Sequence, residues 1–137
     1  MKLNKPRLTK LIDFLKQLPE EKFDFNRVIH KCGTVACAIG WTPSVFPDLV
    51  TTIRIHGDIR LQLKSGDPED WQLYPEVAEE LFNINEYVAA DLFSPQWQHR
   101  LHPDLTELDF EATPKEVAQM LEKFIDLVQQ GKIEDHE

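Results

Sequence analysis

The sequence predicts a mostly helical α+β domain, with about five helices around a buried central helix and one small β-hairpin at the side. Three observations support this fold class. Apolar residues recur at helical spacing in several segments, one stretch alternates apolar and polar residues as a strand does, and residues 34–41 carry no charge, as is typical of a buried helix. The 137 residues fit a single domain, residues 1–137, that is large enough to fold without disulfides or metals.

The first helix is expected over residues 6–18, with Pro6 near its start and Pro19 directly after its end. Its apolar side repeats every three or four residues: Leu8, Leu11, Ile12, Leu15 and Leu18. An irregular connection follows, from which Phe23 and Phe25 are expected to reach back to the core.

A short buried helix is expected next, in the stretch "GTVACAIGW". The hydroxyl of Thr34 can cap its first turn, and Gly40 and Pro43 are expected to end it.

The pattern then changes to that of strands in "TTIRIHGDIRLQLK", residues 51–64. Gly57-Asp58 lies between two alternating runs, which predicts a β-hairpin with one buried face. The residues expected on that face are Ile53, Ile55, Ile59, Leu61 and Leu63.

The second half of the chain predicts three helices. The first covers 75–82, and the second covers 86–93 with Asn85 as its cap. A long irregular segment, "SPQWQHRLHPDLTELDFEA", separates them from the last helix. Segments of this length without regular structure are often functional or mobile.

The closing helix has the clearest start signal in the sequence. Thr113 is the expected N-cap, Pro114 takes the first position, and Glu116 completes a capping box. Gly131 is expected to end the helix, and the acidic tail 132–137 is expected to fray.

The charge balance restricts the classes of partner. The net charge is −9 and the pI is about 5.0, with no cluster of Lys and Arg that could neutralise phosphates. Nucleic acid and anionic membranes are therefore not expected partners. No apolar run reaches the length of a membrane span, and the N-terminus lacks the features of a signal peptide. We expect a cytoplasmic protein with reduced thiols.

The rarest residues gather in "HKCGTVACAIGW", and its candidate functional motif is Cys32, Gly33, Thr34, Cys37, Gly40 and Trp41. Four interpretations stay open. The favoured one is packing, because cysteine behaves as a small hydrophobe and glycine permits close approach. The second is a reactive thiol, Cys37 or Cys32, with His99 or His102 as base, since free amides at a helix start stabilise a thiolate.

The other two interpretations involve bonds to sulfur. His30, Cys32 and Cys37 could join a further histidine around a metal, although the short C-x2-C spacing of structural zinc sites is absent. A Cys32–Cys37 disulfide would close a short, strained loop.

A second candidate site is the loop that carries Trp97, His99 and His102. It could form a ligand pocket or bind an anion, although a solvated loop is the more common outcome for such a stretch.

Three segments together resemble a family of small bacterial and phage proteins with a C-G-T-x-x-C-x-x-G motif. These segments are "CGTVACAIGW", "VAEELFNINEYVAADLFSPQW" and "TPKEVAQMLEKFI". The family is uncharacterised, so the resemblance implies kinship and no activity, substrate or cofactor.

The sequence favours a non-enzymatic module that binds another protein or a small ligand. It contains no Gly-rich phosphate loop, no G-x-S-x-G and no H-E-x-x-H, and it indicates no cofactor. The alternative is a cysteine-dependent hydrolase or transferase. The oligomeric state is open.

Overall fold

The computed structural model describes residues 2–25, 37–67 and 71–133. Within these ranges it confirms a mostly helical α+β fold with a two-stranded antiparallel sheet. The elements are α1 (Lys5–Gln17), η1 (Glu20–Lys22), η2 (Ile39–Trp41), α2 (Thr42–Val45), β1 (Val50–Ile55), β2 (Asp58–Leu63), α3 (Tyr74–Phe82), α4 (Glu86–Leu92), η3 (Gln98–Arg100) and α5 (Pro114–Gln129), where η denotes a short 3-10 helix. None of the helices in the described ranges is both long and apolar enough to cross a membrane.

The predicted caps of the later helices are confirmed. The Thr113 hydroxyl accepts the N–H of Glu116 at 3.2 Å, and the Glu116 carboxylate accepts the N–H of Thr113 at 2.9 Å. The side chain of Asn85 accepts the N–H of Val88 at 2.9 Å. These bonds satisfy amides that a helix start leaves unpaired, so the starts of α4 and α5 follow from local sequence.

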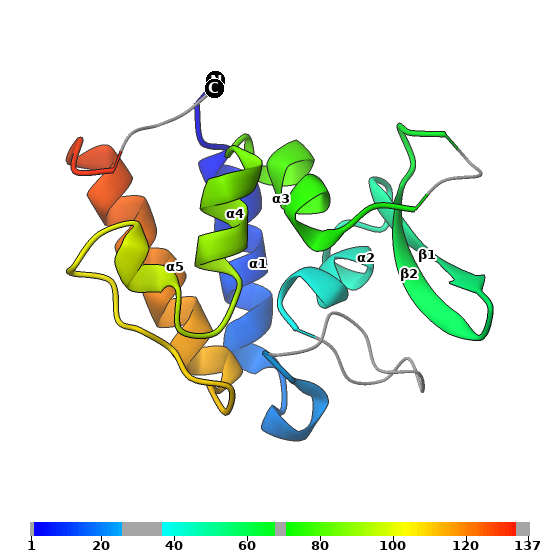
Figure 1. Cartoon of the computed structure of the whole chain (residues 1–137), viewed down its shortest axis with the longest axis horizontal. Coiled ribbons are helices and arrows are strands. Elements are labelled where there is room, and N and C mark those ends of the chain that lie inside the picture. Colours follow the sequence, from blue (N-terminus) through cyan, green and yellow to red (C-terminus); the bar gives the residue numbers. More distant parts are fainter. Residues whose placement is uncertain (1, 26–36, 68–70, 134–137) are drawn as a thin grey trace.

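The helices α1 and α5 lie side by side and antiparallel, and they form the larger part of the core at one end of the molecule (Figure 1). Lys16 and Glu122 join them across the surface at 3.1 Å. The hairpin lies at the opposite end (Figure 1). The apolar stripes that meet between the two helices include Leu8, Leu11 and Leu15 from α1 and Val117, Leu121 and Phe124 from α5, all buried.

The prediction of where the short buried helix in "GTVACAIGW" ends is wrong. The chain does not leave helical geometry at Gly40 and Pro43; the 3-10 turn η2 continues directly into α2. Pro43 is the second residue of α2, where its missing N–H costs no hydrogen bond. The expected cap Thr34 lies outside the described residues. The expected burial is confirmed for residues 37–40.

The predicted hairpin exists, but its turn and its faces differ from the prediction. The turn is His56-Gly57, with φ of +51° and +84°, and Asp58 already pairs with Ile55. Two residues with positive φ are typical of a type I′ turn.

This register places the two apolar runs on opposite faces, because directly paired residues point to the same side. Ile53 lies opposite Arg60, whereas Leu61 lies opposite Thr52. The expectation of one shared apolar face is therefore wrong. Of the five residues expected on that face, only Leu61 is fully buried.

The long segment after α4 is organised around one buried polar side chain. Gln98 is 0% exposed; its amide nitrogen donates to the carbonyls of Leu92 (3.0 Å) and Ser94 (2.6 Å), and its oxygen accepts from the N–H of Leu108 (3.1 Å). A fully satisfied buried amide fixes the backbone that it bonds. The segment therefore has one defined path over the core.

Order continues to the end of the described chain. The amides of Lys132 and Ile133 both donate to the carbonyl of Leu127, and Ile133 is buried. Ordered packing thus extends two residues into the tail that was expected to fray from residue 132. Residues 134–137 lie outside the described ranges.

Candidate functional site

The thiol of Cys37 is buried in the apolar core, with 4% of the residue exposed. Loss of hydration raises its pKa from 9.0 to about 11, and hydrogen bonds from the backbone of Gly40 and Ile39 oppose that rise only in part. A nucleophile at a helix start needs a lowered pKa, so the finding is opposite to the one expected for a reactive Cys37. The group is a free, neutral thiol at physiological pH.

Gly40 and Trp41 also serve packing. Gly40 is buried within η2. The Trp41 ring packs against Phe14 with 5.7 Å between ring centres, and its indole N–H donates to the carbonyl of Lys22 at 3.0 Å. Of the candidate motif, Cys32, Gly33 and Thr34 lie outside the described residues.

Trp97 and His99 lie on the surface, His102 is partly buried, and each contacts its own neighbours. Trp97 is 46% exposed, with the guanidinium of Arg100 at 5.0 Å from its ring centre. The Nδ1 atom of His99 lies 3.2 Å from the carboxylate of Glu107. In the described part of the chain, no hydrogen bond or ion pair joins His99 or His102 to Cys37.

His102 is held by the backbone. Its Nδ1 accepts the N–H of Asp104 at 3.0 Å, so that nitrogen is unprotonated. The Asp104 carboxylate at 3.8 Å from the same nitrogen therefore forms no ion pair in this tautomer.

The ligand set proposed for a metal is not assembled in the described ranges. Among residues 2–25, 37–67 and 71–133, no three His, Cys, Asp or Glu side chains gather closely enough to hold a metal ion. His30 and Cys32 lie outside these ranges.

A surface groove that no motif indicated lies where α1 ends and α5 begins. Because the two helices are antiparallel, the turn after α1 and the segment before α5 come together. They enclose a groove of about 440 Å³, which we call the acidic groove. It is larger than three other hollows formed by described residues, of about 260, 240 and 120 Å³. It is lined by Glu20, Glu21, Phe23, Asp24, Phe110, Glu111, Ala112 and Thr113.

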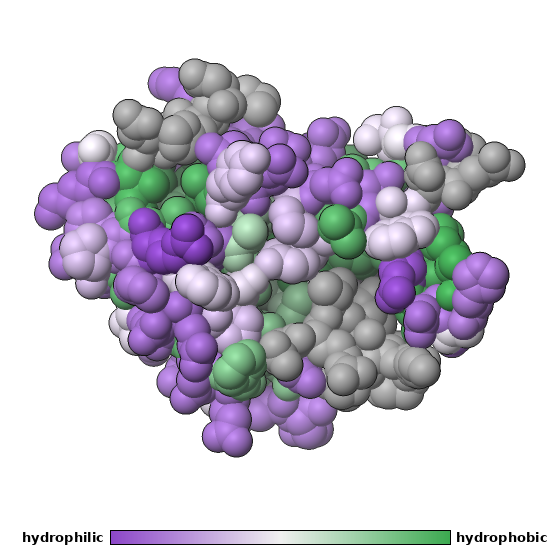
Figure 2. Space-filling model, in the orientation of Figure 1, coloured by the Kyte–Doolittle hydropathy of each residue, from purple (hydrophilic) through white to green (hydrophobic). Residues whose placement is uncertain are grey.

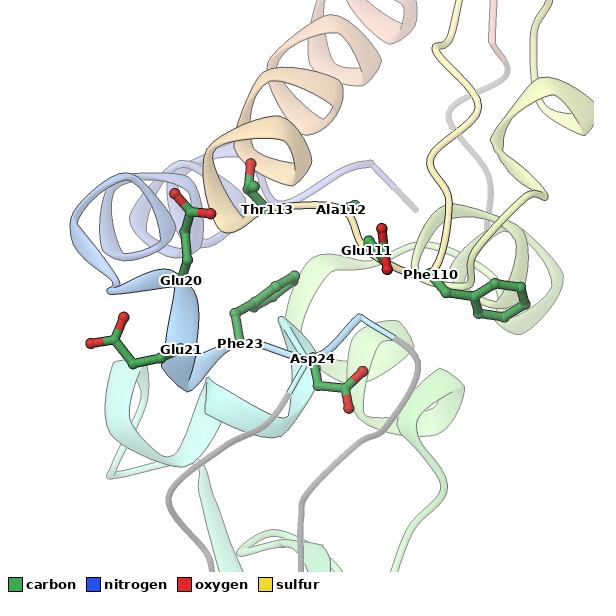
Figure 3. Close-up of a pocket in the computed structure, with 8 residues that line it drawn as sticks. All are labelled: Glu20, Glu21, Phe23, Asp24, Phe110, Glu111, Ala112 and Thr113. Atoms are coloured by element: carbon green, nitrogen blue, oxygen red, sulfur yellow. The ribbon is translucent and has the colours of Figure 1, made fainter.

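Aromatic packing shapes the base of the acidic groove. Phe25 is buried, and the ring of Phe23 stacks on it with centres 6.2 Å apart and an interplanar angle of 18°. Figure 3 shows the Phe23 ring pointing into the space between the two segments, while the Phe110 ring points away from it. Phe110 is 51% exposed. The groove therefore offers one aromatic ring inside and a second at its margin.

All the charged residues that line the acidic groove are negative. Four of its eight lining residues carry carboxylates, and none of the eight is Lys, Arg or His. In Figure 3 these carboxylates come from both walls: Glu20, Glu21 and Asp24 from the turn after α1, and Glu111 from the segment before α5. A hollow lined by one sign of charge raises the local concentration of ions of the opposite sign. The groove is suited to a cation.

Sequence reasoning missed this groove, although a compositional signal was present. "EEKFD" and "LDFEA" both place a phenylalanine among acidic residues, but they lie about ninety positions apart. Only the pairing of α1 with α5 brings them together, and hydrophobic periodicity does not predict helix pairing.

Comparison of the sequence with protein-family models, with curated proteins and with solved structures returned no match.

Proposed function

We propose that this protein is a non-enzymatic binding module of the cytoplasm, and that its acidic groove takes a basic, extended segment of a partner protein. The observation that carries the proposal is the groove itself, with its four carboxylates, its two phenylalanines and no basic lining residue. Cationic side chains satisfy both features, because a carboxylate attracts their charge and an aromatic face attracts a cation.

The chain uses the same pairing elsewhere. The guanidinium of Arg60 lies 5.2 Å from the ring centre of Trp71, and that of Arg100 lies 5.0 Å from that of Trp97. Phe110 has the exposure that a partner's arginine would need for the same contact. The volume of about 440 Å³ falls within the usual range for ligand sites, roughly 300–1,000 Å³.

Charge and burial support this function over the alternatives. A net charge of −9 disfavours nucleic acid and anionic membranes as partners. The buried, neutral Cys37 gives no support to a cysteine-dependent hydrolase or transferase that uses it. No finding favours a cofactor.

The test is binding of a fluorescein-labelled peptide of alternating Arg and Gly, followed by fluorescence anisotropy. A peptide with Glu in place of Arg serves as the negative probe. We expect saturable binding of the basic peptide alone, weakening as salt rises, because exposed charges are screened beyond about 8 Å at physiological ionic strength.

A matched pair of double variants separates the groove from overall charge. Glu21→Gln with Glu111→Gln removes one carboxylate from each wall, and we expect affinity to fall about fivefold, in line with the energy of exposed ion pairs. Glu80→Gln with Asp126→Asn makes the same change in net charge on α3 and α5, outside the acidic groove. Equal losses from both pairs would mean that binding is non-specific, and failure of the basic peptide to bind would overturn the proposal.

A further inference from the structure

The register of the hairpin defines which backbone groups its outer edges present. In an antiparallel pair, alternate residues direct their N–H and C=O toward the partner strand. The two-residue turn makes Ile55 and Asp58 such a bonded pair, so Thr51, Ile53 and Ile55 face β2. Thr52 and Arg54 therefore direct their backbone groups away from β2.

Contacts around the hairpin agree with this assignment. The N–H of Lys64 donates to the carbonyl of Leu49 at 3.0 Å, so Leu49 belongs with the residues of this strand that face β2. The carbonyl of Leu61, on the outer edge of β2, accepts from the N–H of Gln72 at 2.9 Å, and the N–H of Leu63 donates to the Gln72 side chain at 2.6 Å. The outer edge of β2 is thus covered at Leu61 and Leu63.

The outer edge of β1 is covered at one end only. The N–H of Val50 donates to the carbonyl of Phe46 at 3.0 Å. Thr52 and Arg54 are exposed, and no hydrogen bond joins their outward backbone groups to another residue of the described ranges. Neither a proline nor a bulge interrupts this edge. An unprotected edge of this kind pairs readily with another strand.

We propose that β1 pairs antiparallel with β1 of a second copy of this chain, about a two-fold axis at Ile53. In that register Thr52 of each copy lies opposite Arg54 of the other. Both open residues of each edge then exchange N–H and C=O with the partner, giving four hydrogen bonds and leaving no outward group of Thr52 or Arg54 unpaired.

Side chains favour this register over the other two-fold registers. Ile53 lies opposite its own copy, and Arg54 lies opposite a neutral threonine. Centring the axis on Thr52 would place Arg54 against Val50, whose N–H is already bonded, and centring it on Arg54 would oppose two like charges.

The charge of the hairpin differs from that of the rest of the chain. Residues 49–66 carry three basic residues and one acidic residue, a net +2 in a chain of −9, so the two hairpins of a dimer repel each other while each attracts the acidic remainder of the other copy. Figure 2 shows hydrophobic residues at the surface over the hairpin end of the molecule, and also at the opposite end. A contact limited to four backbone hydrogen bonds is smaller than a stable interface, which buries roughly 1,200 Å² or more, so we expect the dimer to be weak and to form at high protein concentration.

The test is sedimentation equilibrium over a wide range of protein concentration, with paired charge variants at Thr52. Thr52→Glu places a carboxylate opposite Arg54 twice, and we expect dimerisation about fivefold tighter. Thr52→Lys places like charges there, and we expect dimerisation about fivefold weaker. Thr106→Glu adds the same negative charge on a distant exposed loop and is expected to give no tightening.

A third variant tests the backbone. Thr52→Pro removes an outward N–H and no bond to β2, so the hairpin is expected to form while the dimer is lost. Circular dichroism checks its folding, and the charge variants keep the test decisive if it misfolds. A monomer at every concentration would overturn the proposal. So would weaker dimers from both Thr52→Glu and Thr52→Lys, because that result would place Thr52 opposite Thr52.

Discussion

The buried turn of residues 37–45 and the acidic groove differ in nearly every property that usually marks a functional site. The buried turn holds a cysteine, a glycine and a tryptophan, residues that are rare in this chain. Most of its side chains are buried, and its one thiol has a raised pKa. Six of the eight residues that line the acidic groove are glutamate, aspartate or phenylalanine, which are common here, and the groove opens to solvent.

This comparison shows that a residue of a rare type is not necessarily one that can react or bind a ligand. Small residues without charge concentrate where backbone segments must approach closely. Charges of one sign that gather in a hollow attract ions of the opposite sign. We expect the buried turn to contribute stability and the acidic groove to contribute binding.

The largest effect is expected at the centre of the buried turn. Ile39 is 0% exposed, and Ile39→Ala should lower the free energy of unfolding by about 3 kcal/mol, through lost burial and the cavity that remains. Urea denaturation followed by circular dichroism measures the change. A loss below about 1 kcal/mol would show that the turn is not part of the cooperative core.

The second prediction concerns the reactivity of Cys37. With a pKa of about 11 rather than 9.0, its thiolate fraction at pH 8 is about a hundredfold lower than in the unfolded chain. We expect iodoacetamide to modify Cys37 rapidly in denaturant and at least about a hundredfold more slowly in the native protein. Fragment-ion mass spectrometry distinguishes Cys37 from Cys32.

The same shift gives a pH dependence of stability. Between pH 9 and 11 the unfolded thiol loses its proton while the native thiol keeps it, so stability should fall as pH rises through this window. Cys37→Ala, which has no group to titrate there, should reduce this fall. Rapid native modification of Cys37 at pH 8 would contradict the buried, neutral thiol and revive the cysteine-enzyme alternative.

Local sequence predicted α4 and α5 because their starts carry their own hydrogen-bonding signals. Thr113 with Glu116, and Asn85, satisfy free amides within one turn, so no distant part of the chain is needed to place α4 and α5. Burial of Cys37 also followed from composition alone. Pro43 was misread, because a proline ends a helix in its interior and is tolerated in its first turn.

The hairpin faces and the acidic groove required information that local patterns lack. A two-residue turn pairs odd-numbered residues with even-numbered ones, so the two apolar runs, which both occupy odd positions, fall on opposite faces; one shared face would require a loop of odd length. The acidic groove depends on which two helices pair. The path of residues 94–112 depends on Gln98, and nothing in its sequence surroundings marks that glutamine as buried.

The smallest effect on stability is expected at the margin of the acidic groove. Phe110 is half exposed, so Phe110→Ala should change the free energy of unfolding by less than about 0.5 kcal/mol, as is usual for surface substitutions. The same variant should weaken binding of the Arg-Gly peptide by about threefold, the effect of losing one exposed cation–π contact. Phe110→Tyr keeps the ring and should retain binding. A Phe110→Ala variant that loses stability but no affinity would assign Phe110 to packing. The acidic groove would then contribute to stability, as the buried turn does, and not to binding.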